Sequence, residues 1–123
     1  MPVPKPVSVT FRSRCPIAST LDLVGDRWTI LIIRDLFFGA SRYSDFARSP
    51  EGIPTNILAS RLRMMESQAL VAKIAYQTKP KRFAYQLTDK GKALLPVMRA
   101  LKNWGMDWIP NRSAEPPTGP RGR

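Results

Sequence analysis

The sequence contains no histidine and a single cysteine, Cys15, among its 123 residues. Without histidine, the chain cannot build a Ser-His-Asp triad or use imidazole as a general acid or base. One cysteine cannot form an internal disulfide or a zinc site of several thiolates. The nine acidic residues form no paired motif, and no glycine-rich phosphate loop occurs. We therefore expect no enzymatic activity, no bound metal and no cofactor.

Long hydrophobic runs are also missing. The longest apolar stretches, 29–33 and 36–38, are separated by Arg34 and Asp35, whereas a membrane span needs roughly 18 apolar residues in a row. The first 14 residues hold three prolines and no apolar segment typical of a secretory signal. Together with the lone cysteine, these features predict a cytoplasmic protein with no membrane partner.

Acidic side chains are scarce relative to basic ones. Nine Asp and Glu stand against 20 Lys and Arg, which gives a net charge of +11. Most of this excess lies in residues 1–108, so it is not a property of the C-terminal end alone. A strongly basic protein raises the concentration of polyanions around itself. The composition therefore indicates nucleic acid or another anionic surface as the partner.

Two segments with prolines and no helical periodicity enclose a single predicted domain. We expect residues 1–14 to be an N-terminal Pro-rich arm and residues 109–123 a flexible basic tail. Residues 15–108 have the length of one domain. Periodicity and capping residues predict short helices within 16–25 and 41–50, and a buried central helix within 26–39, with Asp26 as N-cap and Gly39 as C-cap.

The stretch GIPTNILASRLRMME, residues 52–66, predicts an amphipathic helix over 54–67. Leu58, Leu62 and Met65 share the side expected to be buried. A solvated helix face usually mixes Glu with Lys or Arg, but no acid occurs here before Glu66. The side opposite the apolar one instead carries hydrogen-bonding groups: Asn56, Ser60 and Arg63, with Thr55 nearby and Arg61 on a flank.

After this helix the apolar period changes from about 3.6 to 2. Segments 71–76 and 82–87 are rich in β-branched and aromatic residues, which predicts an antiparallel hairpin. Its tip, residues 77–82, is cationic, and Pro80 prevents regular pairing there. The order of elements, helices followed by a cationic hairpin, is that of a winged helix-turn-helix. In this fold the second helix of the helix-turn-helix motif enters the DNA major groove. The expected fold is mainly α with a small β hairpin.

A long amphipathic helix is predicted after the hairpin, with Thr88 as its N-cap and a kink or break at Pro96. Its apolar residues form one stripe along the helix. This stripe could cover the domain's own core, or it could extend beyond the core and join two copies of the chain. Both interpretations stay open from the sequence. The stripe consists of Leu94, Met98, Leu101, Trp104 and Trp108.

Several of these segments occur together, in order, over residues 15–105. They are CPI (15–17), LVGDRWTILIIRDLFFGASRYSDF (23–46), GIPTNILASRL (52–62), KPKRFAYQLTDKG (79–91) and the Trp104-Gly105 pair. In these segments the chain resembles the HxlR-type family of bacterial winged-helix transcription regulators. The resemblance implies a DNA-binding homodimer, built through its terminal helices, that regulates transcription. It departs at Ala69, where family members usually have Gly and a left-handed conformation would favour Gly or Asn.

The expected partner is a double-stranded DNA operator, palindromic if the protein is a homodimer. Arg can pair with guanine O6 and N7, and Asn with adenine N6 and N7, so the polar helix face supplies the expected base contacts. The hairpin tip and one residue near a helix N-terminus supply the expected phosphate contacts. The predicted DNA-binding residues are Arg42, Thr55, Asn56, Ser60, Arg61, Arg63, Lys79, Lys81 and Arg82.

Cys15 precedes Pro16 and is an N-cap candidate. A thiol at a helix N-terminus near Arg12 and Arg14 could be oxidised readily, and the resemblance implies that some relatives sense oxidants or electrophiles through a cysteine in this region. With one thiol, a switch needs a Cys15–Cys15 link between subunits or a small-molecule adduct. An unpaired cysteine also often behaves as a small buried apolar residue. An oxidant or small-molecule effector therefore stays one of two alternatives.

Two other functions are compatible with the same basic faces. An architectural or RNA-binding protein would use them for shape and charge alone, and would show no base preference. An interaction module would dock the helix 52–66 in a protein groove, and its binding would depend little on salt.

Overall fold

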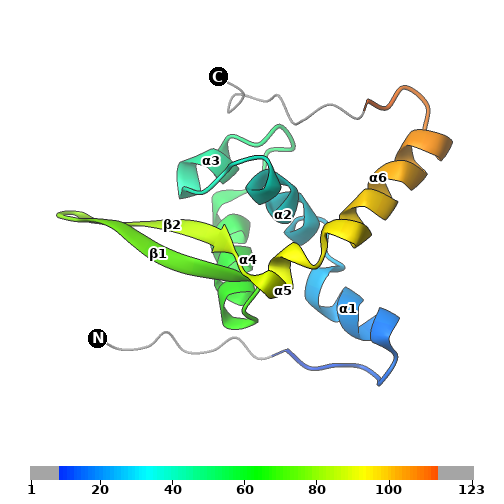
Figure 1. Cartoon of the computed structure of the whole chain (residues 1–123), viewed down its shortest axis with the longest axis horizontal. Helices are drawn as coiled ribbons and strands as arrows, with labels where there is room; N and C mark the ends of the chain where they lie inside the picture. The colour runs from blue at the N-terminus through cyan, green and yellow to red at the C-terminus, as the bar shows by residue number, and fades with distance from the viewer. Residues whose placement is uncertain (1–8, 114–123) are drawn as a thin grey trace.

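The computed structural model describes residues 9–113, so residues 1–8 of the predicted arm and 114–123 of the predicted tail lie outside the described residues. It confirms a mainly helical winged helix-turn-helix fold with one two-stranded antiparallel hairpin. In Figure 1 the hairpin extends to one side of the molecule and the last helix to the other. In chain order the elements are α1 (Pro16–Val24), α2 (Thr29–Phe37), α3 (Tyr43–Ala47), α4 (Thr55–Ser67), β1 (Val71–Thr78), β2 (Lys81–Leu87), α5 (Asp89–Lys92) and α6 (Leu95–Trp108).

The core lies between α2, α3 and α4 and the residues that enter β1. Its largest fully buried apolar side chains are Phe46, Ile33, Leu58, Leu62 and Met65. Burying a side chain of this size contributes roughly 1.5 to 3 kcal/mol. The apolar face predicted for the helix 54–67 is therefore the face that packs on the core. Within residues 9–113, no helix is both long and apolar enough to span a membrane.

Helix α2 begins later than the sequence predicts, because Trp28 and not Asp26 is its N-cap residue. Asp26, two residues before the N-cap, still holds the first turn through its side chain. Its carboxylate accepts hydrogen bonds from the backbone N–H groups of Trp28 and Thr29, at 2.9 and 3.0 Å, and from the Thr29 hydroxyl. Burial raises the pKa of Asp26, but these hydrogen bonds outweigh it and lower the pKa below its ordinary value. At the other end the C-cap is Phe38 and not Gly39 as predicted. Gly39 follows it with φ +98°, a left-handed conformation that suits glycine directly after a helix.

The exit of α4 confirms the left-handed conformation anticipated at Ala69, whose φ is +60°. The Ala69 N–H donates to the Glu66 carbonyl at 3.0 Å, and the Leu70 N–H to the Met65 carbonyl at 2.8 Å. This pair of hydrogen bonds is the Schellman pattern, in which glycine usually occupies the left-handed position. Alanine therefore pays a conformational cost here that glycine avoids.

Substitution Ala69→Gly is expected to stabilise the protein by up to about 1 kcal/mol, because relief of the left-handed strain exceeds the extra chain entropy of glycine. The check is urea unfolding, where the midpoint should rise with an unchanged slope. Ala59→Gly, at an exposed interior position of the same helix, is the matched control and should destabilise by about 1 kcal/mol. A fall in stability in both variants would contradict the assignment of strain to Ala69.

Strands β1 and β2 pair in an antiparallel register from Val71 opposite Leu87 to Thr78 opposite Lys81, with an irregularity between Ala75 and Gln77. The strands therefore extend further toward the tip than the sequence predicts. The predicted break at Pro96 is confirmed, because the last segment forms two helices and Pro96 lies in the first turn of α6. The Thr88 side chain accepts a hydrogen bond from the Gly91 N–H and caps α5 as expected.

Candidate nucleic-acid interface

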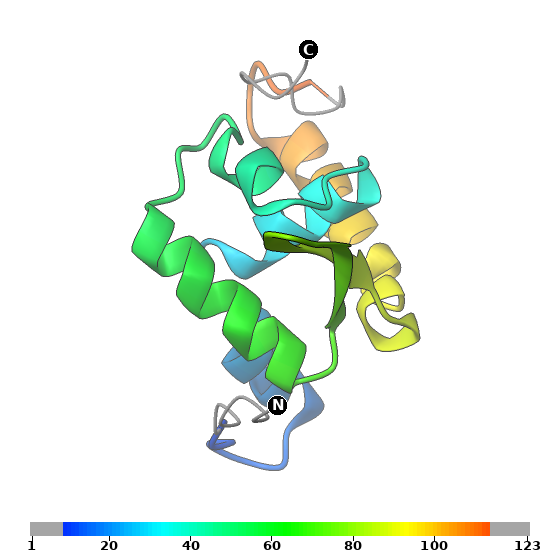
Figure 2. The same cartoon turned by 90° about the vertical axis from the view of Figure 1, so that its left-hand side faces the viewer.

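Helix α4 presents the polar face that the sequence predicts. Leu58, Leu62 and Met65 are at most 1% exposed, whereas Asn56 and Arg63 are exposed and Ser60 is half-buried. Viewed from the hairpin side, α4 and the hairpin lie next to each other on one face of the molecule (Figure 2). The polar face of α4 and the cationic tip of the hairpin can therefore meet one extended ligand.

The start of α4 is tied to α3, the first helix of the helix-turn-helix. The Tyr43 hydroxyl donates a hydrogen bond to the Thr55 carbonyl at 2.8 Å. Pro54 precedes the first turn in an extended conformation, and Thr55 and Asn56 are exposed directly after it. In a helix-turn-helix the N-terminal residues of the second helix contact base edges. Thr55 and Asn56 occupy that position in this chain.

The hairpin forms the wing, with Lys79, Lys81 and Arg82 exposed at its tip. No acidic residue occurs between Glu66 and Asp89, so no carboxylate of the hairpin opposes these cations. Lys79 and Pro80 form the turn between the last paired residues, Thr78 and Lys81. The wing is therefore a cationic projection, as the spacing of its residues predicts.

Residue Arg42 connects α3 to the wing. Its guanidinium lies 4.4 Å from the centre of the Tyr76 ring in β1, and its backbone bridges to Ala84 in β2. Beside it, the Tyr85 N–H donates to the Ser41 carbonyl at 2.7 Å. A cation over an aromatic ring contributes roughly 0.5 to 1 kcal/mol at an exposed site. Arg42 is exposed, so it can fix the wing and still reach a phosphate.

Residue Arg61 lies near an acidic residue of the core domain, and it also lines a hollow together with Ser60 and Arg63. Its guanidinium lies 3.8 Å from the Asp26 carboxylate, and its side chain is 32% exposed. The Nε atom is buried and has no hydrogen-bond partner within residues 9–113. Asp26 accepts hydrogen bonds from the first turn of α2, so Arg61 joins α4 to the start of α2. This contact depends on the tertiary fold, and the helical position of Arg61 alone did not reveal it.

The N-terminal segment lies closer to α4 than the sequence suggests. Residues 9, 10 and 12 form a hollow together with Ser60 and Arg63. The segment is held by Arg12, whose Nε lies 2.5 Å from a carboxylate oxygen of Asp22 in α1. The backbone hydrogen bond from Arg12 lowers the pKa of Asp22. Part of the predicted arm therefore lines the end of the polar face of α4.

Cys15 is exposed and is the N-cap residue of α1, as predicted. Its carbonyl accepts a hydrogen bond from the Ser19 N–H at 2.9 Å, but its thiol makes no capping hydrogen bond. The interpretation of Cys15 as a small buried apolar residue is therefore wrong. Arg12, one of its two predicted cationic neighbours, is paired with Asp22.

The predicted apolar stripe of the last helix divides into two parts. Leu94 and Met98 are half-buried and pack against the core. Leu101, Trp104 and Trp108 are 55%, 61% and 73% exposed. The interpretation that both tryptophans cover the domain's own core is therefore wrong. In Figure 1, α6 and α1 lie on the side of the molecule away from the tip of the hairpin.

The sequence is similar to that of a known regulator. The chain is 39% identical over 100 residues to the HTH-type transcriptional regulator Rv3095 of Mycobacterium tuberculosis; the match covers 81% of this chain and 63% of that protein. The chain thus spans less than two thirds of the length of this relative.

Two solved structures are similar in fold and in sequence. The redox regulator HypR in its oxidised form has a TM-score of 0.70 and 30% identity, with 80% of this chain and 99% of HypR covered. The reduced form of the transcriptional regulator YodB from Bacillus subtilis has a TM-score of 0.66 and 29% identity, with 82% of this chain and 100% of YodB covered. Residues 23–113 match the model of the HxlR-like helix-turn-helix family. The chain belongs to this family.

Proposed function

We propose that the protein is a transcriptional regulator that binds double-stranded DNA sequence-specifically as a homodimer in the cytoplasm. The observation that carries the proposal is the acid-free polar face of α4 beside the cationic wing. Asn56 and Arg63 are exposed on that face, and Lys79 and Arg82 are exposed on the wing. This pairing fits a helix in the major groove and a wing on phosphates or in the minor groove.

The homodimer in this proposal is built through α6. Leu101, Trp104 and Trp108 are apolar and exposed in one copy of the chain, and aromatic side chains of this kind are enriched at the centres of protein interfaces. A two-fold symmetric dimer would present two copies of α4 to a palindromic operator. Half-sites would then lie about one helical turn, roughly 10 base pairs, apart.

The test is selection of binding sites from a random duplex library, followed by titration of the selected sequence at several salt concentrations. Enrichment of a two-fold symmetric sequence supports the proposal. Salt-sensitive binding without any enrichment would contradict it and support an architectural protein that reads charge and shape. Binding that hardly depends on salt would favour the protein-interaction module.

Replacement of Arg63 by alanine is expected to cost about 1 to 3 kcal/mol at the selected site and to relax the preference at one base pair, because a base contact is lost. Lys79→Ala on the wing is the matched variant. It should weaken binding to all sequences alike and reduce the salt slope by about one unit. The measurement is a titration of selected and random duplexes. Equal losses on both duplexes for Arg63→Ala would place Arg63 among the phosphate contacts.

A redox or electrophile response through Cys15 is the second part of the proposal. The exposed thiol and the similarity to the redox regulator HypR support it. Hydrogen peroxide would oxidise two Cys15 thiols to one disulfide between subunits. The two thiol protons and two electrons pass to the peroxide, which is reduced to two water molecules. We expect peroxide to change operator affinity by about tenfold, and Cys15→Ser to abolish this change. A Cys15→Ser protein that still responds would exclude Cys15 as the sensor.

A further inference from the structure

A pocket of about 620 Å³ lies between the C-terminal part of α2, the turn at residues 50–51 and α6. Phe37 at the end of α2, Phe38 directly after it, and Leu95 and Met98 of α6 supply its apolar lining. The cations Arg99 and Lys102 of α6 also line it. A volume of this size is typical of pockets for small organic ligands. The pocket lies away from the polar face of α4, so the proposed contacts with DNA do not use it.

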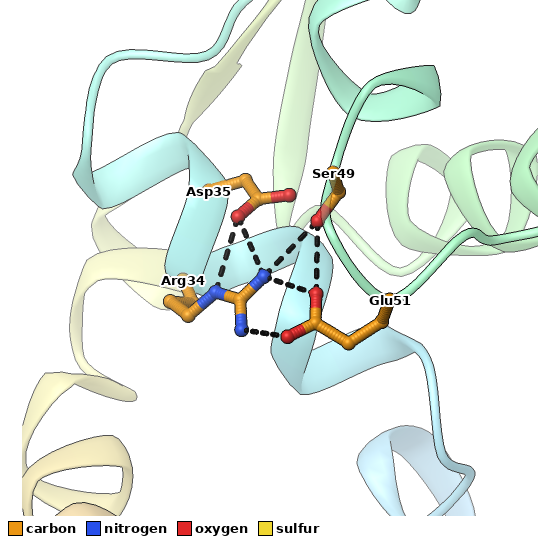
Figure 3. Close-up of polar contacts among 4 residues, drawn as sticks. All are labelled: Arg34, Asp35, Ser49 and Glu51. Atoms are coloured by element: carbon orange, nitrogen blue, oxygen red, sulfur yellow. Dashed lines mark hydrogen bonds and ion pairs between the residues drawn. The ribbon is translucent and has the colours of Figure 1, made fainter. Parts of the chain in front are cut away.

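Four charged side chains line the pocket: Arg34 and Glu51, which are bound to each other, and Arg99 and Lys102. Arg34 is saturated: its guanidinium donates to Asp35, Ser49 and Glu51 at distances of 2.7 to 3.1 Å (Figure 3). Arg99 and Lys102 are exposed, and no carboxylate within residues 9–113 forms an ion pair with either of them. The apolar lining therefore adjoins two unpaired positive charges. A ligand with an aromatic body and one anionic group would complement both features.

The pocket and the tryptophan stripe occupy different sides of α6. With about 100° per residue, Leu95, Arg99 and Lys102 cluster on one side of the helix. Trp104 lies about 160° and Trp108 about 120° around the axis from Lys102. Met98, a member of the predicted stripe, lies between the two sides and lines the pocket. A second copy of the chain on the stripe can therefore leave the pocket open to a ligand.

The pocket also touches the connection to the DNA-facing helix. Glu51 lines the pocket and is held by Arg34 through two oxygen contacts, at 2.7 and 2.8 Å. Four residues later, α4 begins at Thr55. A carboxylate bound near Arg99 and Lys102 would share the pocket with the Glu51 carboxylate and repel it, and a shift of Glu51 would move the chain that leads into α4.

We propose that this pocket binds a small aromatic carboxylate and is the effector site of the protein. The part of the proposal that concerns ligand binding is argued from the pocket alone. The effector role rests on the proposed function, because it requires that α4 binds DNA. The carboxylate would lie near Arg99 and Lys102, with its ring against Phe37 and Phe38.

The test uses 2-naphthoate as the probe and its uncharged analogue 2-naphthamide as the control ligand, in the absence of DNA. Binding is followed by the methyl signals of the methionines in the NMR spectrum. Met98 lines the pocket, whereas Met106 lies two turns further along α6 outside it. We expect 2-naphthoate to shift the Met98 signal, to leave Met106 unchanged and to bind about five- to tenfold more tightly than 2-naphthamide.

Double substitution R99Q/K102Q should remove the preference for 2-naphthoate, and both positions are exposed, so the variant is expected to fold. Lys92→Gln, an exposed position on α5 outside the pocket, should keep the preference. Equal affinity for the two ligands, or a Met98 signal that neither ligand shifts, would overturn the proposal. Because DNA is absent, a protein that fails to select a DNA sequence can still pass this test, so the two proposals can fail separately.

Discussion

Replacement of Trp104 and Trp108 by glutamate is expected to convert the proposed dimer into a monomer and to weaken operator binding about a hundredfold or more. The two indoles are 61% and 73% exposed in a single copy, so their loss should cost the folded monomer little. At an interface they would be central, since aromatic anchors of this kind are often worth 2 kcal/mol or more each. Four such side chains would meet in one two-fold interface.

The loss of DNA affinity follows from geometry rather than from any contact of the tryptophans with DNA. A dimer holds its second copy of α4 near the second half-site, which multiplies affinity by roughly 10² to 10⁴ over a single copy. A monomer loses that factor although its own Asn56 and Arg63 are intact. Binding to an isolated half-site should therefore be nearly the same in the variant and the unmodified protein.

The measurement combines sedimentation equilibrium over a range of protein concentrations with titration of the full operator and of a half-site. Met106→Glu is the matched control, because Met106 is 41% exposed on the same helix but lies about 160° around the axis from Trp104. It should remain a dimer. If the unmodified protein sediments as a monomer at every concentration, the dimer is wrong, and the expectation of a palindromic operator is wrong with it.

Much of the fold follows from local signals in the sequence. The faces of α4 follow from the spacing of Leu58, Leu62 and Met65, because a helix places residues three and four apart on one side. The break before α6 follows from Pro96, since proline removes a hydrogen-bond donor and clashes with the preceding turn. The left-handed residue at Ala69 follows from the requirements of a helix exit. Each of these signals lies within a few residues of the feature that it predicts.

The parts that could not be predicted depend on partners distant in sequence. The helical position of Arg61 is compatible with a DNA contact, and only the packing of α4 on α2 brings it to Asp26. The spacing of the apolar residues in α6 could not decide whether Trp104 covers the core, because apolar residues recur at the same helical period on a side that faces the core and on a side that faces another subunit. The pocket beside Arg99 likewise requires α2 and α6 to be placed in space. The DNA-contacting roles of Asn56 and Arg63 stay predictions.

The largest expected loss of stability comes from a residue that the sequence did not single out. Replacing Arg34 by methionine should lower the free energy of unfolding by about 3 kcal/mol, because it removes a guanidinium from a buried carboxylate. The Asp35 side chain is 2% exposed and lies 3.0 Å from the Arg34 guanidinium, which itself is 20% exposed. Ser49, another acceptor of Arg34, is also buried. The check is urea unfolding at neutral pH.

Two further variants separate the loss of the ion pair from the loss of packing. Glu51→Gln should cost less than about 1 kcal/mol, because Glu51 is 38% exposed and its interaction with Arg34 is screened by water. The double variant R34M/D35N should regain part of the stability lost in Arg34→Met, because it no longer leaves a charged carboxylate behind. A double variant as unstable as the sum of the single variants would show that packing of the arginine, and not its charge, stabilises this region.

The same network also contributes to the response of stability to acid, by an amount that solvent screening of the half-exposed Glu51 reduces. The hydrogen bonds from Arg34 lower the pKa of Glu51 from its ordinary 4.5 to about 2. Because the pKa is lower in the folded protein than in the unfolded chain, the stabilisation by Glu51 is complete above the ordinary value and is lost as the pH falls from there toward about 2. Glu51→Gln should therefore flatten the stability profile in this interval, as should Arg34→Met, which raises the pKa of Glu51 by removing its partner. A profile that is equally steep in all three proteins would assign the acid response to other carboxylates, such as Asp26 and Asp45, whose pKa values are also lowered by hydrogen bonds that outweigh their burial.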